Sequence, residues 1–178
     1  MRTTLTAALF AVVFFASASS FGGPRIGELA KPLDYLEYVD GKPLDLGALR
    51  GRPVVIYFGG DWCEPCVRTA RPGIRSAAKR FPEAHFIVVA IDDNSIRPQK
   101  VREQAEFGVP VAMYKPEYCK PGDCRIDARQ SQLGQFGRVY SIPMAYVLDS
   151  EGVVRHELVG GRGVADNIER ALKPFLKK

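Results

Sequence analysis

The chain has 178 residues, of which 46% are hydrophobic and 25% are charged, and its formal net charge is +5. These proportions are ordinary for a globular protein, and the length suits a single domain. The basic residues are scattered in runs no longer than a pair, which is typical of a solvated surface, so nucleic acid is not an expected partner. No internal repeat or low-complexity segment interrupts the chain.

The first 18 residues predict a secretory signal peptide. A positive charge at Arg2 precedes an apolar stretch over residues 5–16, and Ala16-Ser17-Ala18 fits a small-x-small cleavage site. An uncleaved membrane anchor is the alternative, but the stretch is shorter than the ~20 residues of a spanning helix. No later segment could span a bilayer. We therefore expect an exported, periplasmic protein that contacts a membrane only through a partner.

Short apolar runs alternate with helix-like segments along the rest of the chain. A small hairpin with an Asp-Gly turn is predicted over residues 34–46. Strands are predicted at 53–58, 86–91, 109–114, 140–149 and 153–159, and helices at 63–81, 98–107, 127–136 and 164–176. Pro72 should kink the first of these helices. The last one has an apolar face formed by Val164, Ile168, Ala171, Leu172 and Phe175. The alternation predicts an α/β sheet with parallel central strands and a hairpin at one edge.

Cys63 and Cys66 lie where the buried strand at 53–58 gives way to the first helix. There the Cys63 sulfur would face unpaired N–H groups and the positive end of the helix dipole, which lower a thiol pKa below the ~8.5 of free cysteine. Cys66, one turn further, can close a disulfide with it, and Pro65 stiffens the first turn. The spacing also suits a zinc half-site or a structural staple. A redox pair would use an exposed Cys63 as nucleophile and a less accessible Cys66 as the resolving cysteine.

The residues around this pair extend the pattern. They read Val-Val-Ile-Tyr-Phe-Gly-Gly-Asp-Trp-Cys-Glu-Pro-Cys, with Ser-Ile-Pro some 75 residues on and Val-Leu-Asp-Ser-Glu-Gly after it. This combination resembles the thioredoxin superfamily, and in particular its exported TlpA/ResA-like thiol-disulfide oxidoreductases. The resemblance implies a thioredoxin-like fold over residues 24–178. It would be a central mixed β-sheet flanked by helices, with an N-terminal β-hairpin and a central helix–strand insertion.

The resemblance also implies a substrate-binding surface around the cysteines. Its members would be Trp62, Glu64, Pro65, Ile142 and Pro143. The Ile142–Pro143 bond would be cis and face the redox pair, which leaves the Ile142 backbone free to pair with an extended substrate. An ordinary trans proline is the alternative, and Trp62 has the alternative role of a core aromatic residue.

A buried carboxylate near the second cysteine, which many thioredoxin-like proteins hold, is not predicted here. The two positions where the family places it carry Tyr57 and Thr69. Glu64 and Asp61 lie nearby, but both are expected to be exposed. The direction of electron flow therefore does not follow from the motif.

Cys119 and Cys124 bracket a Lys-Pro-Gly-Asp turn, and an even number of cysteines in an oxidising compartment favours disulfides. A local structural disulfide is the leading interpretation, and a second redox pair or a zinc site with Cys63 and Cys66 are the alternatives. The two histidines, His85 and His156, have no ligand-like spacing and are expected to be structural, so no metal site is predicted.

Together, these patterns and the resemblance predict an exported enzyme that exchanges the Cys63–Cys66 dithiol and disulfide with partner protein thiols. We expect it to act as a reductase, although the motif itself does not set this direction. It would need no cofactor, because electrons arrive from an upstream donor protein through thiols. A disulfide oxidase or isomerase of secreted proteins is the alternative enzyme. The non-enzyme alternative is a copper- or zinc-binding chaperone that uses the same cysteines.

Overall fold

The computed structural model describes residues 26–30, 32–119 and 141–176. The predicted signal peptide, the predicted helix at 127–136 and Cys124 lie outside the described residues. Within these ranges no helix is both long enough and apolar enough to span a membrane.

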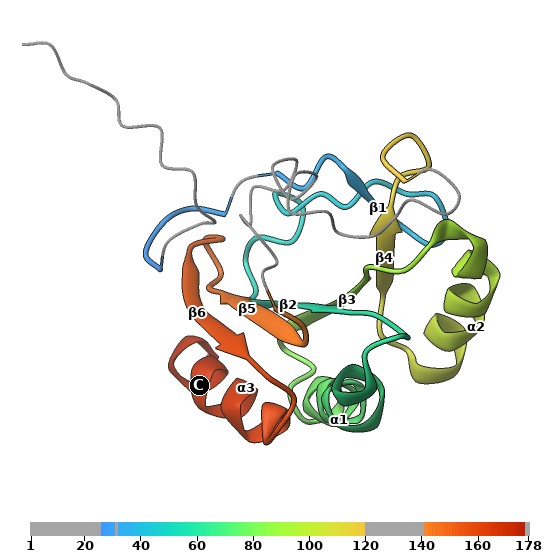
Figure 1. Ribbon diagram of the computed structural model, residues 1–178. Helices are drawn as coiled ribbons and strands as arrows, with labels where there is room; N and C mark the ends of the chain where they lie inside the picture. The colour runs from blue at the N-terminus through green and yellow to red at the C-terminus, as the bar shows by residue number, and fades with distance from the viewer. Residues whose placement is uncertain (1–25, 31, 120–140, 177–178) are drawn as a thin grey trace, which may run out of the picture.

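A six-stranded mixed sheet runs through the described part of the chain, with the strand order β1-β4-β3-β2-β5-β6 (Figure 1). The strands are β1 (Leu36–Tyr38), β2 (Val54–Gly59), β3 (His85–Ala90), β4 (Val111–Tyr114), β5 (Met144–Leu148) and β6 (Val154–Val159). Strands β2, β3 and β4 are parallel, and β1, β5 and β6 pair antiparallel with their neighbours. The predicted α/β sheet with parallel central strands is confirmed.

Strand β2 is buried along all six residues, as expected for a continuous apolar run at the centre of a sheet. Its side chains alternate between two cores. Ile56 and Phe58 belong to one cluster of buried residues, and Val55 and Tyr57 belong to the other. Because β2 ends in this two-sided core, the loop after it starts from a rigid base.

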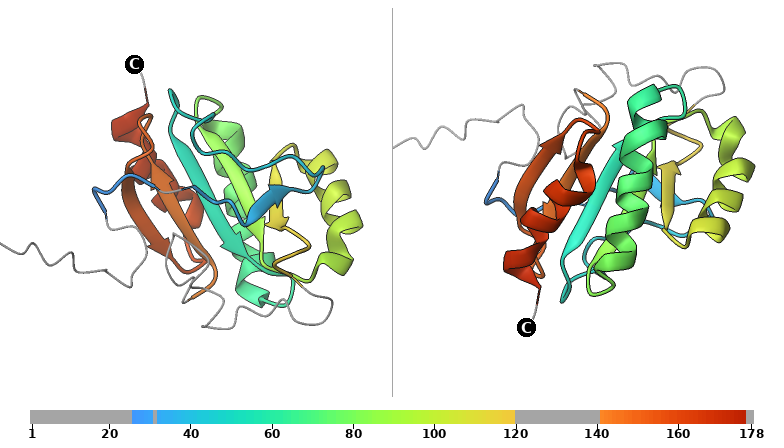
Figure 2. Two further views of the ribbon diagram at one scale, coloured as in Figure 1. Left: turned by 90° about the horizontal axis from the view of Figure 1, so that it is seen from above. Right: turned by 90° about the horizontal axis from the view of Figure 1, so that it is seen from below.

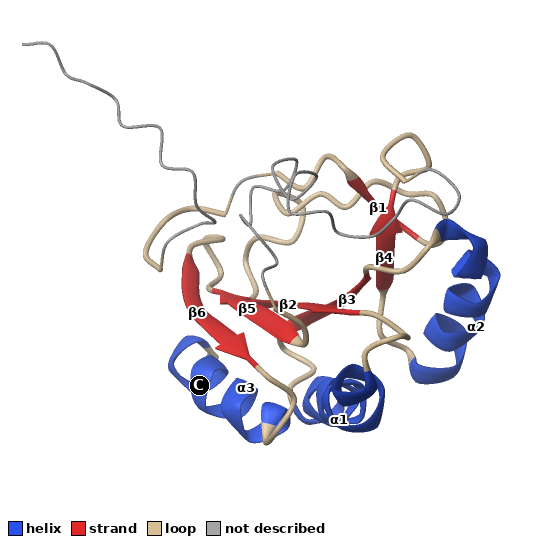
Figure 3. Cartoon of the chain, in the orientation of Figure 1, coloured by secondary structure: helices blue, strands red, loops and turns tan. Residues whose placement is uncertain are grey.

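Different elements cover the two faces of the sheet. Helices α1 (Arg71–Arg80) and α3 (Val164–Leu172) pack side by side on one face, and α2 (Arg97–Phe107) lies at the end of the sheet beside β4 (Figure 2). Among the described residues, loops rather than helices cover the other face (Figure 3), and these contribute Leu33, Leu44 and Leu46 to its core. The buried residues of α3 include Val164, Ile168, Ala171 and Leu172, which confirms its predicted apolar face.

The helix predicted over residues 63–81 changes type along its length. A π-helical stretch, Cys66–Ala70, leads directly into α1, and Pro72 lies in the first turn of α1. Proline has no N–H for the carbonyl four residues earlier, so a wider turn before Pro72 accommodates the break. The kink predicted at Pro72 is therefore a change of helix type just ahead of it.

The predicted N-terminal hairpin is short. Its turn lies at Asp40 and Gly41, where Gly41 has a φ of +86°. The returning chain makes a single bridge, from Pro43 to Glu37, because proline offers no N–H to extend a ladder. Strand β1 forms its main ladder with β4 and so completes that edge of the sheet.

The opposite edge strand, β6, has a partial cover. Residues 27 and 28 pair with the start of β6. Gly27 N–H donates to the Val154 carbonyl at 2.7 Å, and Val154 N–H donates to the Glu28 carbonyl at 2.9 Å. Leu29 also forms a bridge with Val153.

Candidate active site

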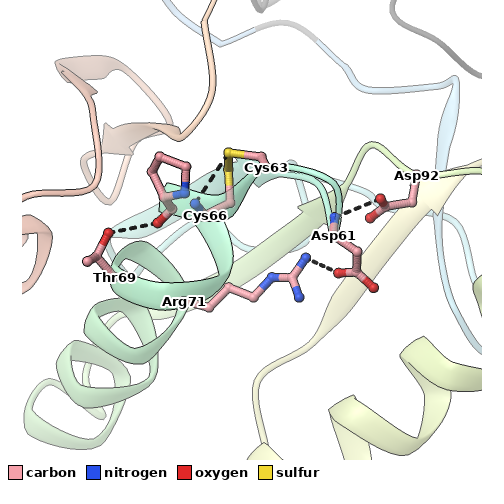
Figure 4. Close-up of a disulfide and its surroundings, with 7 residues drawn as sticks. Asp61, Cys63, Cys66, Thr69, Arg71 and Asp92 are labelled. Atoms are coloured by element: carbon pink, nitrogen blue, oxygen red, sulfur yellow. Dashed lines mark hydrogen bonds and ion pairs between the residues drawn. A yellow bond between two sulfur atoms is a disulfide. The ribbon is translucent and has the colours of Figure 1, made fainter.

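Cys63 and Cys66 form a disulfide at the start of the helix that follows β2, with their Cα atoms 5.2 Å apart (Figure 4). The Val67 N–H donates to the Cys63 carbonyl at 3.1 Å, which is the first helical bond. The Cys66 N–H donates to the Cys63 sulfur at 3.3 Å. Cys63 thus occupies the helix N-terminus, where N–H groups and the helix dipole stabilise a thiolate.

The exposure expected for Cys63 is wrong for this disulfide form. Cys63 is 6% exposed, and Cys66 is fully buried. The order of accessibility agrees with the predicted roles, because the resolving cysteine should be the more protected of the two. The roles themselves stay predictions.

On one side of the disulfide, the loop that follows β6 lies against both the cis proline and the redox helix. The Ile142–Pro143 bond is cis, as the resemblance implied, and the Pro143 carbonyl accepts a hydrogen bond from Gly160 N–H at 2.7 Å. A Cβ added to the next residue, Gly161, would lie 3.4 Å from Pro143 Cγ, 3.1 Å from the Pro65 carbonyl oxygen and 2.5 Å from Thr69 Oγ1. The loop that carries the cis bond therefore meets the redox helix at Gly161.

Sequence reasoning did not single out Gly161, although the Gly160-Gly161 pair after a predicted strand was a signal of close backbone approach. Thr69 Oγ1 donates to the Pro65 carbonyl at 2.7 Å, so its position is fixed by a hydrogen bond. The glycine is required here by lack of space, since its φ is not among the positive ones.

The predicted substrate-binding residues differ in accessibility. Trp62 is 69% exposed, which excludes its alternative role as a core residue, and its indole lies over Gly60. Glu64 is exposed and pairs with Arg68 at 3.1 Å, and Pro65 is also exposed. Ile142 is half-buried and Pro143 is buried. An exposed apolar surface thus adjoins the disulfide, and its use in binding stays a prediction.

Asp61, two residues before Cys63, is not exposed as expected. Its side chain is 29% exposed, and its carboxylate accepts hydrogen bonds from Arg71 and from Lys100, the latter at 2.5 Å (Figure 4 shows the Arg71 contact). Burial opposes ionisation of this carboxyl, but the hydrogen bonds from Lys100 and Arg71 outweigh burial and hold its pKa below the usual range. Asp61 is therefore a partly buried anchor of the loop that carries Trp62.

A buried acid does lie near the site, but it follows β3 rather than lying on β2 or on the redox helix. Asp92, just beyond the end of β3, is 5% exposed, and its Oδ1 accepts the Asp61 N–H at 2.7 Å. Burial raises the pKa of Asp92, against that hydrogen bond, and the Asp61 charge adds to the rise. The carboxyl ends of parallel strands meet at one edge of a sheet, so the acid that follows β3 was a signal that sequence reasoning missed.

Three buried polar atoms have no hydrogen-bond partner among the described residues: Tyr57 Oη, Arg71 Nε and Asp92 Oδ2. Electrostatic interactions link all three groups, and burial raises the pKa of Tyr57.

The two positions considered for a buried acid in the sequence carry no carboxyl group: Tyr57 is buried in the core, and Thr69 bonds to its own helix.

The remaining candidates lie on other elements. Cys119 is buried and takes part in a disulfide. Its predicted partner, Cys124, lies outside the described residues, so the pairing stays a prediction. His85 begins β3, and burial lowers its pKa, as does the charge of Arg52; His156 packs its ring against Phe175. In the described ranges, no cluster of three or more His, Cys, Asp or Glu side chains could hold a metal ion.

Comparison with known proteins places this geometry in a family. The model of the AhpC/TSA family matches residues 26–157. The chain is 24% identical over 140 residues to the thiol-disulfide oxidoreductase ResA of Bacillus thuringiensis, which covers 79% of this chain and 70% of that protein. It is 26% identical over 115 residues to the thiol:disulfide interchange protein DsbE of Pseudomonas aeruginosa, which covers 63% of this chain and 53% of that protein.

A solved structure gives the same result for the fold. It is a thiol:disulfide interchange protein of the thioredoxin family from Chlorobium tepidum, and it is 26% identical with a TM-score of 0.58 over 84% of this chain and 98% of its own. The chain belongs to the AhpC/TSA family, and its predicted thioredoxin-like fold and class, a thiol-disulfide oxidoreductase with a Cys-x-x-Cys disulfide, are confirmed.

Proposed function

We propose that this protein is an exported reductase that uses Cys63 and Cys66 to reduce disulfides in partner proteins. The Cys63 thiolate attacks one sulfur of the partner disulfide and releases the other as a thiolate. The Cys66 thiolate then attacks the Cys63 sulfur, which releases the second partner thiol and closes the Cys63–Cys66 disulfide. The partner gains two electrons, and an upstream donor protein restores the dithiol by the same exchange in reverse.

The observation that carries this proposal is the disulfide at a helix N-terminus, in which Cys63 is the more accessible of the two cysteines. The Cys66 N–H points at the Cys63 sulfur at 3.3 Å and would stabilise it as a thiolate after reduction. Trp62 adjoins it as an exposed apolar side chain, suited to contact with a partner protein.

Export is supported by the sequence pattern of the first 18 residues and by cysteines that favour disulfides. It is tested by the N-terminus of the mature protein after expression in a bacterium. Cleavage after Ala18 and recovery from the periplasm are expected. An intact Met1 on a cytoplasmic protein would contradict export.

The direction of electron flow is tested by the reduction potential of the Cys63–Cys66 pair in glutathione or dithiothreitol buffers. A potential well below about −200 mV is expected for a reductase, whereas a value near −120 mV would indicate an oxidant. Metal content of protein purified under reducing conditions separates both from a copper- or zinc-binding chaperone.

The assignment of Cys63 as the nucleophile has its own test. Reduced protein at neutral pH should be alkylated at Cys63 much faster than at Cys66, because Cys63 lies at the helix N-terminus and is the more accessible. Mass spectrometry after short exposure to iodoacetamide measures the order. Faster labelling of Cys66 would reverse the two roles.

A further inference from the structure

Helix α2 is held to the rest of the protein by charged side chains rather than by an apolar face: Arg97 pairs with Glu37 of β1, and Lys100 pairs with Asp61. Lys100 is its buried residue, and only 1% of the lysine side chain is exposed. A lysine is rarely buried without anionic partners, since desolvation of an ammonium group is costly. The partners of Lys100 therefore show what α2 is built to contact.

Those partners lead to the redox loop. Lys100 Nζ lies 2.5 Å from Asp61 Oδ1, and 3.2 Å from both carboxylate oxygens of Glu103 on its own helix. Arg71 at the start of α1 binds the same Asp61 oxygen and lies 3.8 Å from Glu103. The network thus balances two cations with two anions: Lys100, Arg71, Asp61 and Glu103. Gln99 adds a hydrogen bond to Asp61 Oδ2 at 3.0 Å.

Asp61 is fixed through its backbone as well as through its side chain. Its N–H donates to Asp92 Oδ1 at 2.7 Å, and the Cys63 N–H closes the turn on the Gly60 carbonyl at 3.3 Å. The next residue, Trp62, points outward with 69% of its surface exposed. The turn is therefore anchored from inside by charge, while its outer side remains free for a partner.

We propose that Lys100 is a positioning residue of the redox site: from α2 it holds Asp61, and Asp61 holds the turn of residues 60–62 that presents Trp62 and Cys63 to a partner protein. This inference rests on the proposed function, because it assigns the central helix–strand insertion a task in disulfide exchange with proteins. Small disulfides need no docking on Trp62, so Lys100 should matter less for them.

The test uses Trp62 as a reporter, because it is the only tryptophan in the chain. In a Lys100→Met variant, the fluorescence anisotropy of Trp62 should decay faster, since the turn loses its anchor. Exchange with a protein disulfide, such as that of insulin, should slow by up to about 100-fold, the scale of a ~1 Å misplacement. Exchange with oxidised glutathione should change much less. Lys79→Met, an exposed lysine on α1, is the matched control and should alter none of these.

A double substitution tests the route through Asp61. In an Asp61→Ala background, Lys100→Met should produce no further change in Trp62 motion. An equal effect with and without Asp61 would overturn the proposal, as would an unchanged Trp62 decay in a folded Lys100→Met protein.

Should Lys100→Met fail to fold, Gln99→Ala replaces it, because the exposed Gln99 binds the same carboxylate. A smaller increase in Trp62 motion is then expected, and none would contradict the proposal. Failure of the proposed function would look different. The wild-type protein would exchange no disulfides, while Trp62 would still respond to loss of Lys100.

Discussion

The two sides of the Cys63–Cys66 disulfide are built on different physical principles. On the side of the cis bond the contact is uncharged, and Gly161 lies directly against both Pro143 and the redox helix. On the other side, Asp61 is held by the buried cations Arg71 and Lys100.

Because of this difference, the two sides should respond differently to pH and to salt. Close packing depends on shape and responds little to pH or salt. A charged network depends on protonation, and partly buried pairs lose their stabilisation when one partner is neutralised or removed. The site should therefore lose its charged side first under acid conditions, while the side at Gly161 persists.

Removal of Asp61 should have the largest effect on stability. Asp61→Ala leaves Glu103 as the carboxylate that pairs with Lys100 and Arg71, and removal of the partner of a buried charge such as Lys100 costs about 3–5 kcal/mol. Urea unfolding at neutral pH measures the loss. Glu64→Ala, which breaks an exposed pair with Arg68, is the control and should unfold like the wild type. Equal stability of both variants would mean that the network does not support the fold.

A smaller loss is expected on the uncharged side. Gly161→Ala places a methyl group against Thr69 Oγ1 and the Pro65 carbonyl, and such overpacking costs about 1–3 kcal/mol. Adding Thr69→Ala removes the nearer obstacle and should recover part of the loss. Thermal unfolding of the single and double variants, at low and high salt, measures both effects. A strong salt dependence in Gly161→Ala would contradict a steric origin.

The smallest expected effect on stability is the pH dependence that Asp92 introduces. Its pKa is raised above the ordinary 3.8, so the stability that depends on its protonated form is complete below that value and is lost as pH rises through the raised pKa. Asp92→Asn removes this loss. The free energy of unfolding of the variant, relative to that of the wild type, should therefore increase from about pH 4 to about pH 7. Urea unfolding at both pH values measures the difference.

Asp61 supplies the opposite sign within the same network. Its pKa is lowered, so its contribution is present above its ordinary value and is lost as pH falls. Asp61→Asn should therefore lose stability relative to the wild type at neutral pH, and the difference should shrink in acid. If both asparagine variants changed with pH in the same direction, the assigned shifts would be wrong.

The elements whose signal is local were predictable from the sequence. The continuous apolar runs of β2 and β3 and the apolar face of α3 lie where the pattern placed them. Cys63 and Cys66 were found because their spacing and the strand before them are local as well.

What the sequence did not reveal depends on contacts between distant residues. Asp61 was expected to be exposed because its partners, Arg71 and Lys100, are 10 and 39 residues away. The φ of Gly161 is not positive, and the close packing of the redox helix against it explains the glycine. Such tertiary contacts leave no periodic trace in the sequence.

The pairing of residues 27–29 with the start of β6 covers backbone groups that would otherwise be open to another chain. An edge strand offers unpaired backbone groups to any other chain, and proteins commonly cover such edges. Here the cover is the segment that follows the predicted signal peptide, through the hydrogen bonds of Gly27 and Glu28 with Val154. A recombinant protein that starts at residue 24 keeps this cover. One trimmed to Leu33 would keep the redox site and expose the beginning of β6 to a neighbouring molecule.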